Sequence, residues 1–138
     1  MPDGPAAVGE DRFDRRRRRH RRRVIVHDDS MRPLFRPGDR LYLDTEPGRP
    51  VRVGDVVALR DPEMAGRLLL KRIVAVAEAA GPGSPKCPPG TVWVEGDNPA
   101  SSRDSRQFGA VPSEHIVGVA WFRYAPTDRR GPLTPRYR

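Results

Sequence analysis

The sequence contains a single cysteine, Cys87, among its 138 residues. An internal disulfide is therefore excluded, and the composition suits a reducing compartment. No stretch of about 18 apolar residues occurs, so the sequence predicts no membrane-spanning helix. The arginine-rich run near the N-terminus is followed by only three apolar residues, 24–26, too few for the apolar core of an export signal. These absences predict a cytoplasmic protein.

The net charge of +8 is unevenly distributed. Residues 1–23 contain nine arginines, four acidic residues and one large apolar side chain, Phe13. Such a segment buries too little apolar surface to fold, so we expect a disordered basic arm over 1–23, one folded domain over 24–125 and a flexible tail over 126–138. No specific nucleic-acid binding is expected of the nearly balanced remainder. At most, the run from Arg15 to Arg23 predicts peripheral contact with anionic membrane.

Short β-branched runs separated by glycine, proline and aspartate predict a mainly β fold with one compact core. The predicted strands are residues 24–27, 40–43, 55–60, 67–78, 91–95 and 116–124. The run 67–78 is the longest and lacks a polar face at helical spacing, which favours a buried strand that bends midway. Residues 30–34 are expected to form a short turn, because Pro33 limits any helix there.

Lysine is the scarcest of the common charged residues, since only Lys71 and Lys86 accompany 24 arginines. Strand alternation places Lys71 on the same face as Leu69 and Ile73. A lysine can lose its proton when it is buried, whereas an arginine cannot, and burial lowers a lysine pKa by up to roughly 3–5 units. Lys71 is therefore a candidate general base. Taken alone, such a residue is more often a lysine whose stem packs while its amine reaches solvent.

Ser30 follows a predicted strand and lies on a tight turn. A serine hydroxyl becomes a nucleophile when a base takes its proton, and the serine's own N–H can face the developing oxyanion. On its own, Ser30 could also be an ordinary turn residue. A polar loop over 96–106 carries hydroxyl, carboxylate and guanidinium groups, and we expect Asp104 and Arg106 to pair there.

Five motifs occur in order along the chain: Ser30-Met31-x-Pro33, Gly38-Asp39, Gly54-Asp55-Val56-Val57, Lys71-Arg72-Ile73-Val74, and Gly96-Asp97-Asn98 followed by Ser102-x-Asp104-Ser105-Arg106. Over residues 24–122 this set resembles the type I signal peptidase family. The resemblance implies a β-rich catalytic core, a serine endopeptidase with a Ser/Lys dyad, a protein substrate, and chemistry that needs no cofactor or metal.

Carried over by position, the resemblance assigns a role to each candidate residue. Ser30 would be the acylating nucleophile and Lys71 its base. Ser102 would orient the Lys71 amine, and Met31 would line the substrate cleft. Asp104 and Arg106 would form a structural ion pair near the site.

Asp28 departs from the pattern of some family members, in which a serine two residues before the nucleophile donates to the oxyanion. An ionised aspartate can only accept. We therefore expect the Ser30 backbone N–H to stabilise the oxyanion by itself, or the Asp28 side chain to point away.

Three functions follow from these observations. The chain more closely resembles a soluble branch of the family that removes an N-terminal propeptide from nickel-type superoxide dismutase, and this is the leading hypothesis. The alternative is a signal peptidase held at the membrane by its basic arm and cleaving signal peptides. A third is a self-cleaving DNA-binding regulator with a Ser/Lys pair, against which stand the missing helix-turn-helix pattern and the loop over 96–106.

Overall fold

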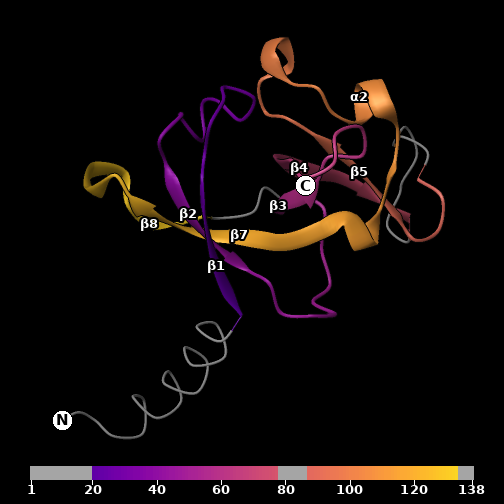
Figure 1. Ribbon diagram of the computed structural model, residues 1–138, viewed down its shortest axis with the longest axis horizontal. Coiled ribbons are helices and arrows are strands. Elements are labelled where there is room, and N and C mark those ends of the chain that lie inside the picture. The colour runs from indigo at the N-terminus through magenta and orange to yellow at the C-terminus, as the bar shows by residue number, and fades with distance from the viewer. Residues whose placement is uncertain (1–19, 78–86, 134–138) are drawn as a thin grey trace, which may run out of the picture.

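The structure is a computed structural model that describes residues 20–77 and 87–133 (Figure 1). In these residues, eight strands form one antiparallel sheet in the order β1-β2-β7-β3-β4-β5-β6, with β8 paired to β7. The strands are β1 (Arg21–Ile25), β2 (Arg40–Asp44), β3 (Val56–Arg60), β4 (Leu68–Val76), β5 (Thr91–Glu95), β6 (Val111–Pro112), β7 (Ile116–Ala125) and β8 (Gly131–Pro132). The only α-helix in the described residues is the short α2 (Ser105–Phe108). The prediction of a mainly β fold is confirmed.

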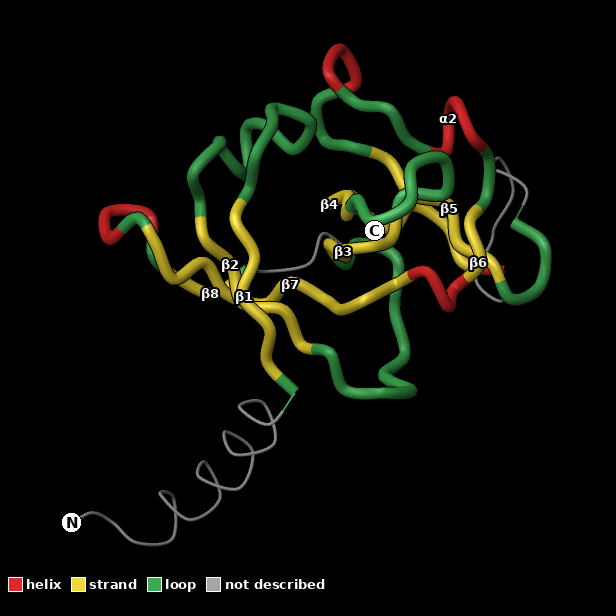
Figure 2. The backbone as a smooth tube through the Cα atoms, in the orientation of Figure 1, coloured by secondary structure: helices red, strands yellow, loops and turns green. Residues whose placement is uncertain are grey.

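The sheet is curled, and its longest strand, β7, pairs with three other strands at different points along its length (Figure 2). The first part of β7 pairs with β3 and the remainder with β2, with register shifts along both ladders. Register shifts of this kind bend a strand and increase its twist. The curled sheet encloses two hydrophobic clusters. Strand β3 lies between them: Val56 and Ala58 belong to one cluster, and Val57 and Leu59 to the other.

Five of the six predicted strands agree with the structure within two residues at each end. Residues 91–95 coincide with β5, and the turn over 30–34 is also present. Strand β4 bends as expected: residues 68–72 pair with β3, and residues 72–76 pair with β5 across a register shift. The two-residue strands β6 and β8 were not predicted.

The described fold extends past both ends of the predicted domain, 24–125. Strand β1 begins at Arg21, inside the predicted arm, because the backbone of residues 21–25 pairs with β2 irrespective of side-chain charge. Inside the predicted tail, Thr127–Arg129 forms a 3-10 turn, β8 pairs with β7, and Leu133 packs on the core. Residues 1–19 of the arm and 134–138 of the tail lie outside the described residues. No helix in the described parts of the chain is long and apolar enough to cross a bilayer.

Candidate active site

The turn that carries Ser30 is held in place by side chains buried in the hydrophobic core. Met31 lies within the turn and Phe35 directly follows it; both are buried, and the Phe35 N–H donates to the Met31 carbonyl at 3.0 Å. Ser30 itself is 3% exposed. The buried side chains of Met31 and Phe35 therefore fix the backbone next to Ser30.

The Gly38-Asp39 motif supports the same turn. Asp39 is buried and accepts hydrogen bonds from the Arg36 N–H at 3.0 Å and from the guanidinium groups of Arg123 and Arg129. Arg123 also donates to the Leu34 carbonyl at 2.7 Å. A buried carboxylate is stable when it is paired and hydrogen-bonded in this way. The motif is therefore structural, and it ties the end of β7 to the turn.

Lys71 projects from β4 between Leu69 and Ile73, as strand alternation predicts, and is 2% exposed. Its Nζ donates to Ser102 Oγ at 3.2 Å. Burial is the largest influence on the Lys71 pKa and lowers it. Two carboxylates oppose that effect and two arginines reinforce it, and the net direction is downward. Lys71 is thus closer to deprotonation than an exposed lysine.

Asp104 organises the loop that brings Ser102 to Lys71. Its buried carboxylate accepts from the Ser102 hydroxyl, from the Gly96 N–H at 2.8 Å and from Arg106, whose Nη2 lies 2.7 Å away. Burial alone would raise the Asp104 pKa, but the hydrogen bonds from Arg106, Ser102 and the backbone lower it to about 2. The same aspartate caps α2 with Gln107 in a capping box. The carboxylate therefore stays ionised and holds the Ser102 hydroxyl in place.

Gly96 lies where three segments of the site meet. A Cβ at this position would fall 2.3 Å from Ser102 Oγ and 2.7 Å from the Ser30 carbonyl oxygen. Only a residue without a side chain permits this approach. The glycine of the Gly96-Asp97-Asn98 motif is thus required by packing between the Ser30 turn and the Ser102 loop.

The next two residues fasten the Ser30 turn directly. The Asn98 N–H donates to the Ser30 carbonyl at 2.9 Å. Asp97 forms a two-point ion pair with Arg72, at 2.9 and 2.8 Å, and Arg72 also donates to the Gly54 carbonyl at 2.7 Å. Lys71 and Arg72 are neighbours on β4, so one strand holds both the amine and the loop that steadies Ser30.

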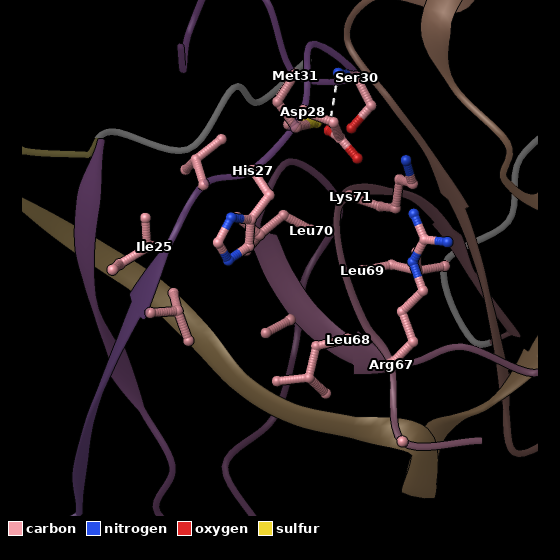
Figure 3. Close-up of a pocket in the computed structure, with 14 residues that line it drawn as sticks. Ile25, His27, Asp28, Ser30, Met31, Arg67, Leu68, Leu69, Leu70 and Lys71 are labelled. Carbon is pink, nitrogen blue, oxygen red and sulfur yellow. Dashed lines mark hydrogen bonds between the residues drawn. The ribbon is translucent and has the colours of Figure 1, made fainter. Parts of the chain in front are cut away.

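Ser30, Asp28 and Lys71 converge at one end of a pocket of about 390 Å³ (Figure 3). The pocket is lined mainly by apolar side chains from the segment 24–26 and from 68–70 of β4. The Ser30 and Lys71 side chains are directed toward each other, although no hydrogen bond joins Ser30 Oγ to Nζ among the described residues. Such contacts are often long before substrate binds.

Asp28 does not point away from the site. Its Oδ1 accepts the Ser30 backbone N–H at 3.1 Å, the donor expected to face the oxyanion. Burial raises the Asp28 pKa, but the Ser30 N–H, the Ser30 hydroxyl and the charge of Lys71 together lower it, so the group is a carboxylate. In this structure the expected oxyanion donor is occupied.

The structure brings together all six residues singled out in the sequence: Ser30, Met31, Lys71, Ser102, Asp104 and Arg106. The pairing of Asp104 with Arg106 is confirmed. Met31 lines the pocket, but it is 1% exposed and its Sδ accepts the Asp97 N–H at 3.4 Å, so it is chiefly a core residue. In the described parts of the chain, no group of three His, Cys, Asp or Glu residues is placed to hold a metal ion.

Sequence reasoning did not find the contacts of Arg103. This residue binds the buried Asp61 and also Glu63, at 2.7 Å, and thereby joins the β3–β4 turn to the Ser102 loop. The guanidinium of Arg103 also lies over the Phe108 ring, 5.6 Å from its centroid. In the sequence, Arg103 is only the variable residue of the motif Ser102-x-Asp104. No local pattern indicates that it pairs with Asp61 and Glu63.

Comparisons with known proteins place the chain in one family. The profile of the family described as "Signal peptidase, peptidase S26" matches residues 78–125, which include the Ser102 loop. The mitochondrial ATP-independent inner membrane protease subunit 1a of Arabidopsis thaliana is 35% identical over 125 residues, covering 78% of this chain and 73% of that protein. The chain belongs to the signal peptidase family, peptidase S26.

Other members of the family show the same relationship over different lengths. Mitochondrial inner membrane protease subunit 1 of Xenopus tropicalis is 31% identical and covers 80% of this chain, with 72% of its own length matched. Signal peptidase I of Bacillus caldolyticus is 52% identical over 44 residues, 32% of this chain and 24% of the relative. The resemblance to type I signal peptidases is therefore confirmed, and the chain is a signal peptidase-like peptidase.

Proposed function

We propose that this chain is a serine endopeptidase in which Ser30 is the nucleophile and Lys71 its general base. The observation that carries the proposal is the environment of Lys71. Its amine is buried on an apolar strand, has a lowered pKa, is held by Ser102 and is directed toward Ser30 at one end of the pocket. A buried amine that loses its proton readily is what an otherwise unreactive serine requires.

The proposed reaction has two steps. Ser30 Oγ attacks the carbonyl carbon of the scissile peptide while its proton passes to Lys71 Nζ. The tetrahedral intermediate collapses, the C–N bond breaks, and Lys71 gives that proton to the leaving amine. Water, deprotonated by Lys71, then attacks the ester carbonyl, the bond to Ser30 Oγ breaks, and Lys71 returns the proton to Oγ, which releases the acid and the free hydroxyl. Ser102 and Asp104 hold the Lys71 amine throughout.

Two free strand edges support an extended protein substrate. Among the described strands, β1 pairs only with β2, and residues 68–71 of β4 pair only with β3. Residues from both of these edges line the pocket. An extended peptide can therefore add its backbone to a sheet edge and bring a carbonyl to Ser30.

The proposed substrate is the precursor of a nickel superoxide dismutase, processed in the cytoplasm by removal of its N-terminal propeptide. This choice is supported by the closer resemblance of the chain to the branch of the family that removes such propeptides. Co-expression with such a precursor, followed by mass analysis of its N-terminus, tests it. We expect the mature N-terminus with the wild-type chain and unprocessed precursor with Ser30→Ala or Lys71→Arg.

Two outcomes would contradict different parts of this proposal. Full processing by either variant would refute the Ser/Lys dyad. An unprocessed precursor with the wild-type chain, together with cleavage of a signal-peptide substrate by the same preparation, would refute only the substrate. Lys86→Arg is the matched control for Lys71→Arg, because it makes the same change at the other lysine of the chain.

A second candidate function, a membrane-associated signal peptidase, is favoured by the outer face of β1, β2 and β7. Arginines there stack on aromatic rings: Arg21 on Tyr42 at 4.4 Å, Arg23 on Tyr124 at 5.9 Å and Arg130 on Phe122 at 5.6 Å. The rings also stack on one another, with the centroids of Tyr42 and Tyr124 4.5 Å apart. Aromatic and basic side chains together suit the interface of an anionic bilayer.

Vesicle sedimentation tests this second function. The full chain is mixed with vesicles of neutral lipid or of neutral lipid with about a third anionic lipid, in low and high salt. Binding that requires anionic lipid, weakens with salt and falls in the Arg21→Gln, Arg23→Gln, Arg130→Gln triple variant is expected of a membrane-held enzyme. A chain that stays in the supernatant in every condition rules this function out.

A further inference from the structure

The carboxylate of Asp28 faces the proposed nucleophile from two residues upstream. Its Oδ1 accepts the Ser30 N–H at 3.1 Å, closing a turn of the kind that aspartate side chains commonly form. The hydroxyl of Ser30 also interacts with this carboxylate and, like the N–H, favours its ionised form. Asp28 thus engages both groups through which Ser30 would act.

This contact is incompatible with the acylation step. The carbonyl oxygen becomes negatively charged as Ser30 attacks, and it needs hydrogen-bond donors at about 3 Å. The N–H of the nucleophile is the donor that the geometry of attack brings nearest. A carboxylate oxygen on that N–H takes the same place, and it adds a second negative charge beside the first.

The neighbouring loop has no replacement donor ready. The Asn98 N–H is bonded to the Ser30 carbonyl, and its side-chain amide donates to the Asp29 carbonyl at 3.0 Å. The Asp97 N–H is directed at Met31 Sδ. In the described part of the site, the Ser30 N–H is therefore the donor that has to be released.

We propose that Asp28 holds the resting site closed by occupying the Ser30 N–H, and that a bound substrate opens it by displacing this carboxylate. The inference rests on the proposed role of Ser30 as the nucleophile. Although its carboxylate is partly buried against the turn, Asp28 as a residue is exposed, so its side chain has room to rotate. Arg67, whose charge already acts on Asp28, lines the same pocket and offers the displaced carboxylate a new partner.

This arrangement makes Asp28 a specificity-determining residue. A long substrate that pairs with both strand edges has binding energy available to displace the carboxylate, whereas a short one has little. The wild-type site should therefore discriminate against small acyl donors. Removing the charge of Asp28 should relieve that discrimination, with the largest effect on the smallest substrate.

Acylation by p-nitrophenyl acetate tests the proposal without a peptide substrate. The rate of p-nitrophenol release that depends on Ser30, taken relative to Ser30→Ala, is measured for the wild type, Asp28→Asn and Asp28→Ala. One oxyanion donor is worth about 10²–10³ in rate, so partial release of the N–H should accelerate acylation on the order of tenfold in Asp28→Asn. Asp29→Asn is the matched control, because its carboxylate pairs with Arg32 rather than with Ser30, and it should change the rate less than about twofold.

A second measurement reports the contact itself. The Ser30 amide proton, followed by NMR, should move upfield in Asp28→Ala and stay in place in Asp29→Asn, since a hydrogen bond to a carboxylate shifts an amide proton downfield. An unchanged amide resonance would overturn the proposal even if Asp28→Ala perturbs the turn.

The kinetic outcomes separate this inference from the proposed function. Ser30-dependent acylation that is no faster in Asp28→Asn than in the wild type refutes the closed resting site and leaves the nucleophile standing. Slower Ser30-dependent acylation in Asp28→Asn also refutes the closed resting site, and it indicates instead that Asp28 assists Lys71. If no preparation shows acylation that depends on Ser30, the proposed nucleophile fails and this inference with it.

Discussion

Replacing Asp104 by asparagine keeps the shape of the side chain and removes its charge. A carboxyl group with a folded pKa of about 2, against an ordinary value of 3.8, contributes about 2 kcal/mol to the free energy of unfolding at neutral pH. An amide also cannot accept from Gly96, Ser102 and Arg106 at once. The Arg106 side chain is one third exposed, so water can solvate its charge when the carboxylate is removed. We therefore expect the free energy of unfolding to fall by about 2–3 kcal/mol in total.

The pH dependence of this loss follows from the sign of the pKa shift. The folded pKa is depressed, so the stabilisation is complete well above 3.8 and disappears as the pH falls through about 2. The part that comes from the carboxylate should shrink by about half between pH 7 and pH 3. Urea unfolding of the wild type and Asp104→Asn at both values measures it.

The exposed Asp128 provides the control for this experiment. Asp128→Asn should change the free energy of unfolding by less than about 0.5 kcal/mol at either pH. A difference between the wild type and Asp104→Asn below about 0.5 kcal/mol at pH 7, or one that does not shrink at pH 3, would show that the buried carboxylate does not stabilise the loop.

Three further outcomes are expected. Activity should rise with pH through the lowered pKa of Lys71, so that half-maximal kcat/KM is reached below the usual lysine range of about 10.4; a profile that rises only there would contradict burial as the cause. Arg103→Gln should move that rise to higher pH, since the positive charge of Arg103 lowers the Lys71 pKa, whereas Arg103→Lys should leave it in place. Gly96→Ala should lower kcat on the order of 10²-fold and also lower Tm, because its Cβ would displace Ser102 or the Ser30 carbonyl; a fully active variant would show that these segments are not closely packed.

The sequence pattern predicted most of the sheet because the core strands carry their own signal. Alternating Val92 and Val94, and the apolar run of β4, identify strands without reference to the rest of the chain. The ends of the fold gave no such signal. Strand β1 begins with three arginines, and only its pairing with β2 makes them part of the sheet. Composition describes side chains, whereas this pairing is made by the backbone.

The residues of the site also divide into those that a local sequence pattern marks and those that it does not. The scarcity of lysine and the apolar setting singled out Lys71, and the charged loop suggested that Asp104 pairs with Arg106, two residues away. The contact of Arg103 with Asp61 joins residues 42 positions apart, and no local pattern could predict it. The orientation of Asp28 was left open for another reason: an aspartate two residues before a turn serine can face solvent or the N–H with equal local plausibility.

The bonds of Asp39 connect the far end of the chain to the chemistry at its beginning. This buried carboxylate beneath the Ser30 turn takes one of its two cations, Arg129, from beyond the last long strand. A chain shortened to end at Ala125 would keep every residue assigned to the reaction and still leave that carboxylate with Arg123 alone. Truncations that remove Arg129 are thus connected, through Asp39, to the turn that carries the nucleophile. An activity assay is therefore a sensitive readout of changes made about 100 residues away from Ser30.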